Sequence, residues 1–212
     1  MTVEENLNRI LEEVKNYHPK IVAVTKYYGI DKMIEAYNAG LRDFAENKVL
    51  DAIGKINNID DTIKSQSVYH FIGHLQTNKV KHAVGTFDYI HSVDSVKVAK
   101  CVDSEANKKG IIQKILIQVN NANETQKFGI APCNLENLID DISNMHNVEL
   151  VGLMNIAPLT DDINELNRLF CEMRKLKEQY NLKELSMGMS HDYKIALDNG
   201  ATMIRLGRIL FK

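Results

Sequence analysis

The chain has 212 residues, and 26 Lys and Arg against 28 Asp and Glu give it a formal net charge of −2. Hydrophobic residues make up 44% and charged residues 25%, which is typical of a folded globular protein and excludes a disordered or low-complexity chain. The balanced charge provides no basic field for nucleic acid or anionic lipid, so neither is an expected partner.

The cysteines and the first residues indicate where the protein works. Cys101, Cys133 and Cys171 are odd in number and far apart, which disfavours a disulfide framework and a cysteine-based zinc site. The chain starts without the basic and apolar regions of a signal peptide, and no apolar run approaches the roughly 20 residues that span a bilayer. We therefore expect a protein of the reducing cytoplasm that does not enter membranes.

The first predicted element is a helix over about residues 3–17. Thr2 and Glu5 have the spacing of a capping box, and apolar residues then recur at helical spacing, at Leu7, Ile10, Leu11 and Val14. The apolar run at 21–24 follows and is typical of a strand buried on both faces.

Strand-like runs and helix-like stretches alternate along the rest of the chain. The further strands are predicted at 42–45, 68–72, 89–93, 114–119, 150–154, 184–187 and 203–206. The clearest helical stripe lies between 161 and 180 and is predicted to pack in the core with Ile163, Leu166, Phe170, Met173 and Leu176.

Repeated βα units imply parallel strands, because parallel neighbours need crossover connections. Together with the run at 21–24 the predicted strands number eight, which favours an α/β fold of the closed (β/α)8 TIM-barrel type, formed as a single domain over 1–212. An open doubly wound sheet is the alternative. Little chain follows the last strand, so we expect the N-terminal helix to fill the place of the eighth helix.

Active sites of parallel barrels lie at the carboxyl ends of the strands, and three segments with suitable chemistry fall there. Lys26 follows the first strand, where partial desolvation would make it an amine nucleophile that forms a Schiff base, although it could also reach solvent at the rim. Ser190 follows Gly188 after the seventh strand and is predicted to cap the next helix. Gly207 follows the eighth strand.

The loops after strands seven and eight are where barrels often bind phosphate, because backbone N–H groups and a helix N-terminus converge there. A lysine amine that faces such a site suits a phosphorylated aldehyde. Pyridoxal 5′-phosphate fits, and so does a phosphosugar in a Schiff-base aldolase; composition and spacing do not separate the two.

A resemblance separates them. The chain is similar to the YggS/PROSC family of pyridoxal phosphate homeostasis proteins, whose fold is that of the alanine racemase barrel. The matching segments run in order along nearly the whole chain: 23–26 (AVTK), 44–47 (FAEN), 70–79 (HFIGHLQTNK), 118–120 (QVN), 127–130 (KFGI), 152–154 (GLM), 186–190 (SMGMS) and 205–207 (RLG). Each segment alone is weakly specific, whereas their combination is highly specific.

The resemblance implies a role for each of eight residues in binding pyridoxal phosphate. Lys26 matches the lysine that holds the cofactor as an internal aldimine, and Arg205 matches the arginine that faces the pyridine nitrogen. Ser190 matches a residue whose side chain binds the phosphate. Gly207 and Arg208, after the eighth strand, match the loop whose backbone binds the phosphate. The remaining positions near the cofactor are Asn47, Met154 and His70, and a hydrogen-bonded histidine at the barrel rim is an equal alternative for the last.

The chain departs from the family pattern at several positions. Thr25 replaces a common serine. Ala45 replaces the usual glycine before Glu46, where its methyl group is expected to alter loop packing. Arg208 stands where threonine is frequent, so a hydroxyl contact to phosphate is lost while the backbone N–H remains. Relatives also usually continue beyond Lys212.

Other patterns favour ordinary structural roles. His70 and His74 have the i, i+4 spacing of a helical metal site, but the residues between them indicate the end of a strand, so we expect no metal. The small basic cluster of Lys79, Lys81 and His82 is typical of a solvated helix face. Lys127 lies in a loop where it could assist phosphate entry, although a surface lysine is favoured.

The expected function is a pyridoxal phosphate carrier or buffer rather than an enzyme with robust turnover. A cation such as Arg205 opposite the pyridine nitrogen disfavours its protonation, which weakens the ring as an electron sink. Alanine racemases share this arginine but add a second base from another domain, for which this chain has no room. The alternatives are a weak amino-acid racemase, a Schiff-base lyase, and an interaction protein with a vestigial site. A monomer that serves pyridoxal phosphate-dependent apoenzymes is expected.

Overall fold

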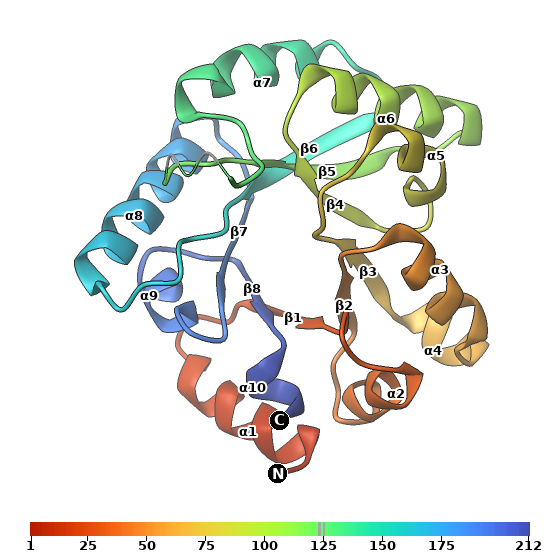
Figure 1. Cartoon of the computed structure of the whole chain (residues 1–212), viewed down its shortest axis with the longest axis vertical. Helices are drawn as coiled ribbons and strands as arrows, with labels where there is room; N and C mark the ends of the chain where they lie inside the picture. The colour runs from red at the N-terminus through yellow and green to blue at the C-terminus, as the bar shows by residue number, and fades with distance from the viewer. Residues whose placement is uncertain (123, 125) are drawn as a thin grey trace.

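The computed structural model describes residues 1–122, 124 and 126–212, and its centre is a closed barrel of parallel strands (Figure 1). The strands pair in chain order, and the last closes the ring against the first. Their bounds are β1 Lys20–Val24, β2 Asp43–Glu46, β3 Val68–Phe71, β4 Tyr89–Val93, β5 Gln113–Gln118, β6 Val148–Met154, β7 Glu184–Met189 and β8 Met203–Leu206. The predicted (β/α)8 barrel is confirmed, and each predicted strand overlaps an observed one.

Helices form an outer ring around the strands, as Figure 1 shows. They are α1 Val3–Val14, α2 Ile30–Asn38, α3 Val49–Asn58, α4 Asp61–Gln66, α5 Val80–Ala83, α6 Val96–Lys109, α7 Leu135–Ser143, α8 Ile163–Gln179, α9 Tyr193–Asp198 and α10 Arg208–Phe211, with short 3₁₀ turns at Thr77–Lys79 and Pro132–Asn134. Among these described helices, none is both long and apolar enough to cross a membrane.

Alternation along the strands divides the apolar core into two layers. In β1, Ile21 and Ala23 belong to the large cluster between the strands and the helices, whereas Val22 belongs to a small cluster with Ala45 and Met203. Because successive side chains of a strand point to opposite faces, the small cluster lies inside the barrel. The methyl group of Ala45 therefore packs in the barrel interior with Val22 and Met203, and its expected effect on loop packing stays a prediction.

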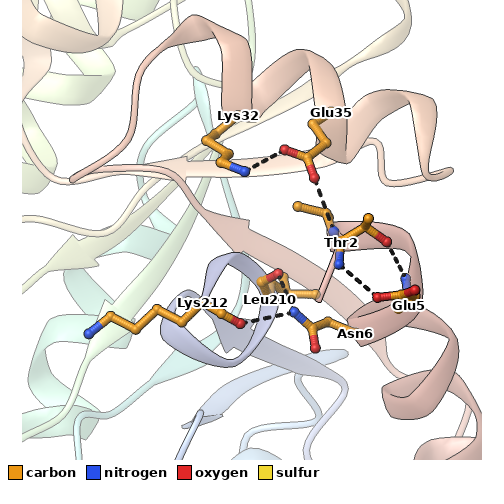
Figure 2. A network of polar contacts seen from close by, with 8 residues as sticks. Thr2, Glu5, Asn6, Lys32, Glu35, Leu210 and Lys212 are labelled. Atoms are coloured by element: carbon orange, nitrogen blue, oxygen red, sulfur yellow. Dashed lines mark hydrogen bonds and ion pairs between the residues drawn. The ribbon is translucent and has the colours of Figure 1, made fainter.

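Helix α1 takes the place beside the last strand, as the sequence predicts. Figure 2 shows its Asn6, which is buried, donating from Nδ2 to the backbone oxygens of Leu210 and Lys212 at 3.1 and 3.3 Å. On the other side, the Val3 N–H donates to the carboxylate of Glu35 on α2 at 3.1 Å. The first helix thus bridges α10 and α2 and completes the outer ring.

Two details of the predicted helices are corrected. Helix α1 ends at Val14 rather than near 17, because the chain turns toward β1 and His18 adopts a left-handed φ of +50°. The capping box of Thr2 and Glu5 is present as predicted. In α8 the stripe is buried from Leu166 onward, but Ile163 stands exposed in the first turn.

Candidate functional site

A cavity of about 430 Å³ opens at the carboxyl ends of the strands. Its wall includes five of the eight residues that the sequence places in the site: Lys26, Ser190, Arg205, Gly207 and Arg208. They come from the segments after β1 and β7 and from β8 with its following turn. Barrel closure brings these segments together, because β8 lies between β7 and β1.

Lys26 lies two residues beyond β1 and is partly buried. Its Nζ stands 4.9 Å from the ring centroid of the exposed Tyr27. A primary amine is thus held at the wall of the cavity. In its neutral form such an amine is a nucleophile for a carbonyl group.

A buried polar network holds the turn that carries this lysine. Lys55 of α3 donates to the backbone oxygen of Thr25 at 2.8 Å and to the carboxylate of Glu46 at 2.7 Å. The Thr25 hydroxyl donates to the same carboxylate oxygen at 2.7 Å. Thr25 and Glu46 are almost fully buried, so these bonds fix the end of β1 to β2 and α3.

The opposite wall provides neutral donors and acceptors near a helix start. Ser190 follows β7, and its Oγ lies 3.5 Å from the backbone N–H of Ile209, in the only turn of α10. The prediction that Ser190 caps the next helix is wrong: α9 begins after Asp192, whose Oδ1 accepts from the Met189 N–H at 2.5 Å. The Ser190 side chain therefore faces the cavity and α10 instead of α9.

Arg205 is the buried cation of the cavity wall. It donates from Nη1 to Ser186 Oγ at 2.8 Å and from Nη2 to the backbone oxygen of Asn155 at 2.7 Å. Complete burial lowers the pKa of Arg205 to about 10, and the Asp192 carboxylate acts in the opposite direction. The guanidinium therefore stays charged at neutral pH.

Three predicted site residues lie away from the cavity wall. Asn47 follows β2, where its backbone oxygen would be only 2.1 Å from a Cβ at Gly73, so that close approach requires glycine. Met154 is fully buried in an apolar cluster with Leu116 and Val151. His70 is fully buried in β3, between Asp43 and His91.

His70 and His74 do not lie together on a helix, because His70 belongs to β3 and His74 follows the end of that strand. His70 points into the barrel, whereas the His74 ring stacks on Phe128 with centroids 3.7 Å apart and lies 3.7 Å from the Asp94 carboxylate. In the part of the chain that the structure describes, no group of three or more His, Cys, Asp or Glu side chains gathers for a metal.

Sequence reasoning did not find the rest of the wall. Asp192 and His191 line it from the loop after β7, and Ala157, Pro158 and Leu159 line it from the segment after β6. A usable signal was Pro158, because a proline shortly after a strand in a βα unit marks a loop at the carboxyl face. Lys127 reaches the same segment, with Nζ 3.2 Å from the Ala157 oxygen.

Comparison with known proteins identifies the family. The family model described as the alanine racemase N-terminal domain matches residues 2–212. The pyridoxal phosphate homeostasis protein of Aquifex aeolicus is 35% identical over 226 residues, covering 100% of this chain and 98% of that protein. The mouse protein of the same name is 34% identical, covering 99% of this chain and 82% of its own length. This chain belongs to the pyridoxal phosphate homeostasis protein family.

Solved structures of this family share the whole barrel. PipY of Synechococcus elongatus, solved with PLP bound, is 36% identical, with a TM-score of 0.91 and coverage of 99% of this chain and 100% of that one. An alanine racemase of Clostridium difficile, 14% identical, has a TM-score of 0.77 over 97% of this chain and 56% of the racemase chain. The second likeness shows the fold alone.

Proposed function

We propose that this protein binds pyridoxal 5′-phosphate in the mouth cavity and takes part in the homeostasis of that cofactor. The observation that carries the proposal is the convergence of a lysine amine, a buried arginine and a set of anion-binding groups on one cavity of about 430 Å³. This volume lies in the range of small-molecule sites, roughly 300–1,000 Å³. The names of the curated relatives and the PLP-bound state of PipY support it.

The residues of the wall fit the chemical groups of the cofactor. The Lys26 amine suits the aldehyde, and the Arg205 guanidinium suits an unprotonated pyridine nitrogen, which would accept a hydrogen bond from it. The Ser190 hydroxyl and the backbone N–H groups of Gly207 and Arg208 suit the phosphate, since the first amides of a helix favour an anion. Asn47, Met154 and His70 would act around these contacts rather than on the cavity wall.

We propose a covalent link at Lys26. Its neutral amine adds to the aldehyde carbon and loses one water, which gives a carbon–nitrogen double bond, the Schiff base. The link reverses when another amine takes over the carbon and Lys26 regains its free amine. Such reversibility suits a carrier that accepts and releases the cofactor.

Arg205 makes robust amino-acid catalysis less favourable, although alanine racemases share this arginine and compensate for it with a second base. Bound pyridoxal phosphate supplies an electron sink whose strength depends on protonation of the ring nitrogen. A charged guanidinium opposite that nitrogen disfavours the protonation. Arg205 therefore limits amino-acid chemistry at the site, and we expect little racemisation. Sustained racemase turnover at ordinary enzyme rates would overturn the carrier role.

The test of the site is a visible spectrum before and after pyridoxal phosphate is added, followed by borohydride reduction and peptide mapping. We expect a yellow band that reduction fixes on the peptide containing Lys26. In Lys26→Ala the band and the label should disappear, while weaker, reversible binding through the phosphate contacts remains. Lys48→Ala is the matched control, because Lys48 is an exposed rim lysine whose one ion pair among the described residues is with Asp51, at 3.7 Å. Wild-type affinity in Lys26→Ala would overturn the covalent assignment.

We also propose that the protein works as a cytoplasmic monomer that supplies pyridoxal phosphate-dependent apoenzymes. The unpaired thiols of Cys101, Cys133 and Cys171 support a reducing compartment. The cavity opens at the surface beside the exposed Tyr27 and Leu159, so a recipient could reach it. Size-exclusion chromatography with light scattering tests the monomer. Recovery of activity by an apoenzyme given the loaded protein, faster than with free cofactor at its released concentration, tests the delivery.

A further inference from the structure

A continuous row of polar side chains crosses the interior of the barrel. Arg205 Nη1 lies 2.8 Å from Ser186 Oγ, and Ser186 Oγ lies 3.0 Å from His91 Nδ1. His91 Nε2 lies 2.8 Å from His70 Nδ1, and His70 Nε2 lies 2.9 Å from Asp43 Oδ1. The row starts at the mouth cavity and ends at the first residue of β2, at the opposite pole of the barrel.

The two ends of the row determine the direction of every hydrogen bond in it. A guanidinium only donates, so Ser186 Oγ accepts from Arg205, and an ionised carboxylate only accepts, so His70 Nε2–H donates to Asp43. With both imidazoles neutral, His70 Nδ1 then accepts from His91 Nε2–H. His91 Nδ1 is left as an acceptor, and the Ser186 hydroxyl donates to it. Each neutral histidine thus carries its proton on Nε2.

The opposite direction would need either an unprotonated nitrogen that faces a carboxylate or a buried cation. If His91 Nδ1 donated to Ser186, His91 Nε2 would accept from His70 Nδ1–H. His70 Nε2 would then either face the Asp43 carboxylate without a proton or make His70 an imidazolium. His70, His91 and Ser186 are all fully buried, so the charged alternative is costly.

Charged groups around the row agree with neutral histidines. Burial lowers the pKa of His70 and, more strongly, that of His91. Lys20 acts in the same direction on both; it lies 3.8 Å from Asp43. Asp43 and Asp88 oppose the shift at His70, and Arg205 reinforces it at His91. The Tyr89 ring stacks on the His70 ring with centroids 4.8 Å apart and an angle of 7° between the ring planes, which restricts rotation of the imidazole.

We propose that Ser186, His91, His70 and Asp43 form a one-way hydrogen-bond chain that positions Arg205 toward the ligand in the mouth cavity. The inference rests on the proposed function in one respect only, that the ligand is pyridoxal phosphate. Ser186 holds Nη1 and the Asn155 carbonyl holds Nη2, so the guanidinium is fixed by both amino groups. These four residues are positioning residues, because they act through Arg205. For His70 this gives a role behind the site instead of in contact with the cofactor.

The first experiment uses the wild-type protein without cofactor. Nitrogen-15 NMR of the imidazoles at pH 7.5 should show His70 and His91 both neutral and both protonated on Nε2. In Ser186→Ala the His91 Nδ1 resonance should shift, because this nitrogen loses its hydrogen-bond donor, whereas the Nε2–H tautomer should remain, because His70 and Asp43 still fix it. An Nδ1–H tautomer or an imidazolium at either position in the wild-type protein would overturn the chain. This result does not depend on whether the protein binds pyridoxal phosphate.

The second experiment measures what the chain does for the ligand. Ser186→Ala should weaken binding of pyridoxal phosphate about tenfold, as loss of a hydrogen bond to a charged group predicts, and should shift the pH dependence of the bound cofactor's absorbance. Borohydride should still label Lys26. Ser92→Ala is the matched control, since Ser92 is a buried β4 serine whose Oγ has no hydrogen-bond partner among the described residues.

Asp43 provides a conservative pair of variants at the far end. In Asp43→Asn the amide oxygen still accepts from His70 Nε2–H, so affinity and spectrum should stay near those of the wild-type protein. In Asp43→Ala the acceptor is lost. The affinity should then fall and the pH dependence of the absorbance should shift, as in Ser186→Ala. Binding and spectra equal to wild type in Ser186→Ala and Asp43→Ala would overturn the positioning role. Absence of binding in the wild-type protein would instead overturn the proposed function.

Discussion

Single buried polar residues in this barrel depend on specific partners. Both side chains of the Lys55–Glu46 ion pair, close to Lys26, are largely buried, since they expose 18% and 5% of their surface. A buried pair need not stabilise the fold compared with apolar residues, but removal of one partner leaves an uncompensated charge. The pair Lys48–Asp51 has 73% and 61% exposure and is solvated whether or not its partner is present.

Lys55→Met should therefore destabilise the protein by about 3 kcal/mol, because the Glu46 carboxylate and the Thr25 carbonyl lose their donor. Lys48→Met, the control, should change the free energy of unfolding by less than about 1 kcal/mol. Urea unfolding followed by circular dichroism measures both. The double variant Glu46→Met with Lys55→Met should recover part of the loss. Equal effects of the two single lysine variants would contradict the buried role of Lys55.

The buried histidines predict a pH dependence of stability. The pKa values of His70 and His91 lie below the ordinary 6.5, so below that pH the unfolded chain binds more protons than the folded one. Their contribution to stability is complete above about pH 6.5 and falls as the pH drops, by up to about 1.4 kcal/mol per pH unit for each histidine. His91→Gln should flatten this slope in urea titrations between pH 7.5 and 5.5, whereas His82→Gln, a change at a partly exposed position on α5, should not. Parallel slopes in all three proteins would contradict neutral burial of His91.

At the scale of elements, the connection between β7 and α9 shapes the anion-binding wall. Gly188 has a φ of +89°, and a Cβ there would lie 2.6 Å from the Ala196 Cβ of α9. The Asp192 carboxylate accepts a hydrogen bond from the Met189 N–H across the turn that leads into α9. Within this turn, Ser190 lies beside α10. The position of Ser190 thus follows from a glycine and a carboxylate on either side of it.

Gly188→Ala should destabilise the protein by about 2–3 kcal/mol, because the added methyl group overlaps α9 and the left-handed backbone becomes strained. It should also weaken phosphate-dependent ligand binding, since Ser190 moves with the turn. Gly54→Ala in α3 is the control, because nothing lies within 4 Å of the place that a Cβ would take there. Alanine also favours a helix over glycine by up to about 1 kcal/mol. Thermal unfolding and ligand titration measure both effects. A stable Gly188→Ala protein with unchanged binding would contradict the proposed geometry of the turn.

At the scale of the whole molecule, the barrel closes where the first strand, β1, pairs with the last strand, β8. Helices α1 and α10, from opposite ends of the sequence, lie side by side (Figure 1), and Asn6 joins them (Figure 2). The seam between the two ends of the described chain is therefore part of the outer layer, while the barrel itself is joined by β1 and β8.

A circular permutant should therefore fold. If a short flexible linker joins Lys212 to Met1 and new ends are opened between Gly110 and Ile111, both elements at the seam remain and the cut lies in a loop after α6, at the amino-terminal pole. We expect native circular dichroism, a cooperative unfolding transition and ligand binding within about threefold of the parent. A cut inside β5, between Ile115 and Leu116, should prevent folding. An unfolded loop permutant would show that the seam needs its original ends.

Much of the fold was readable from residue patterns. Short apolar runs alternating with amphipathic stretches predicted each strand, because parallel strands buried on both faces leave a continuous apolar signature. Lys26, Ser190, Gly207 and Arg208 were placed by their position after strands. The start of α9 was missed because Ser190 and Asp192 are both residue types that favour an N-cap. The helix begins only after Asp192, whose side chain accepts from the Met189 N–H instead of from the helix.

The sequence by itself determined the order and type of the elements, the barrel and the lysine at the mouth, because these depend on local periodicity and on residues at strand ends. It also indicated the family, through the resemblance of several short segments in chain order. Only the tertiary structure decided which polar side chains meet inside the barrel. Asp43, His70, His91, Ser186 and Arg205 come from five different strands, and their contacts depend on strand register and closure. Each bond joins residues at least 19 positions apart, a distance over which no sequence periodicity acts.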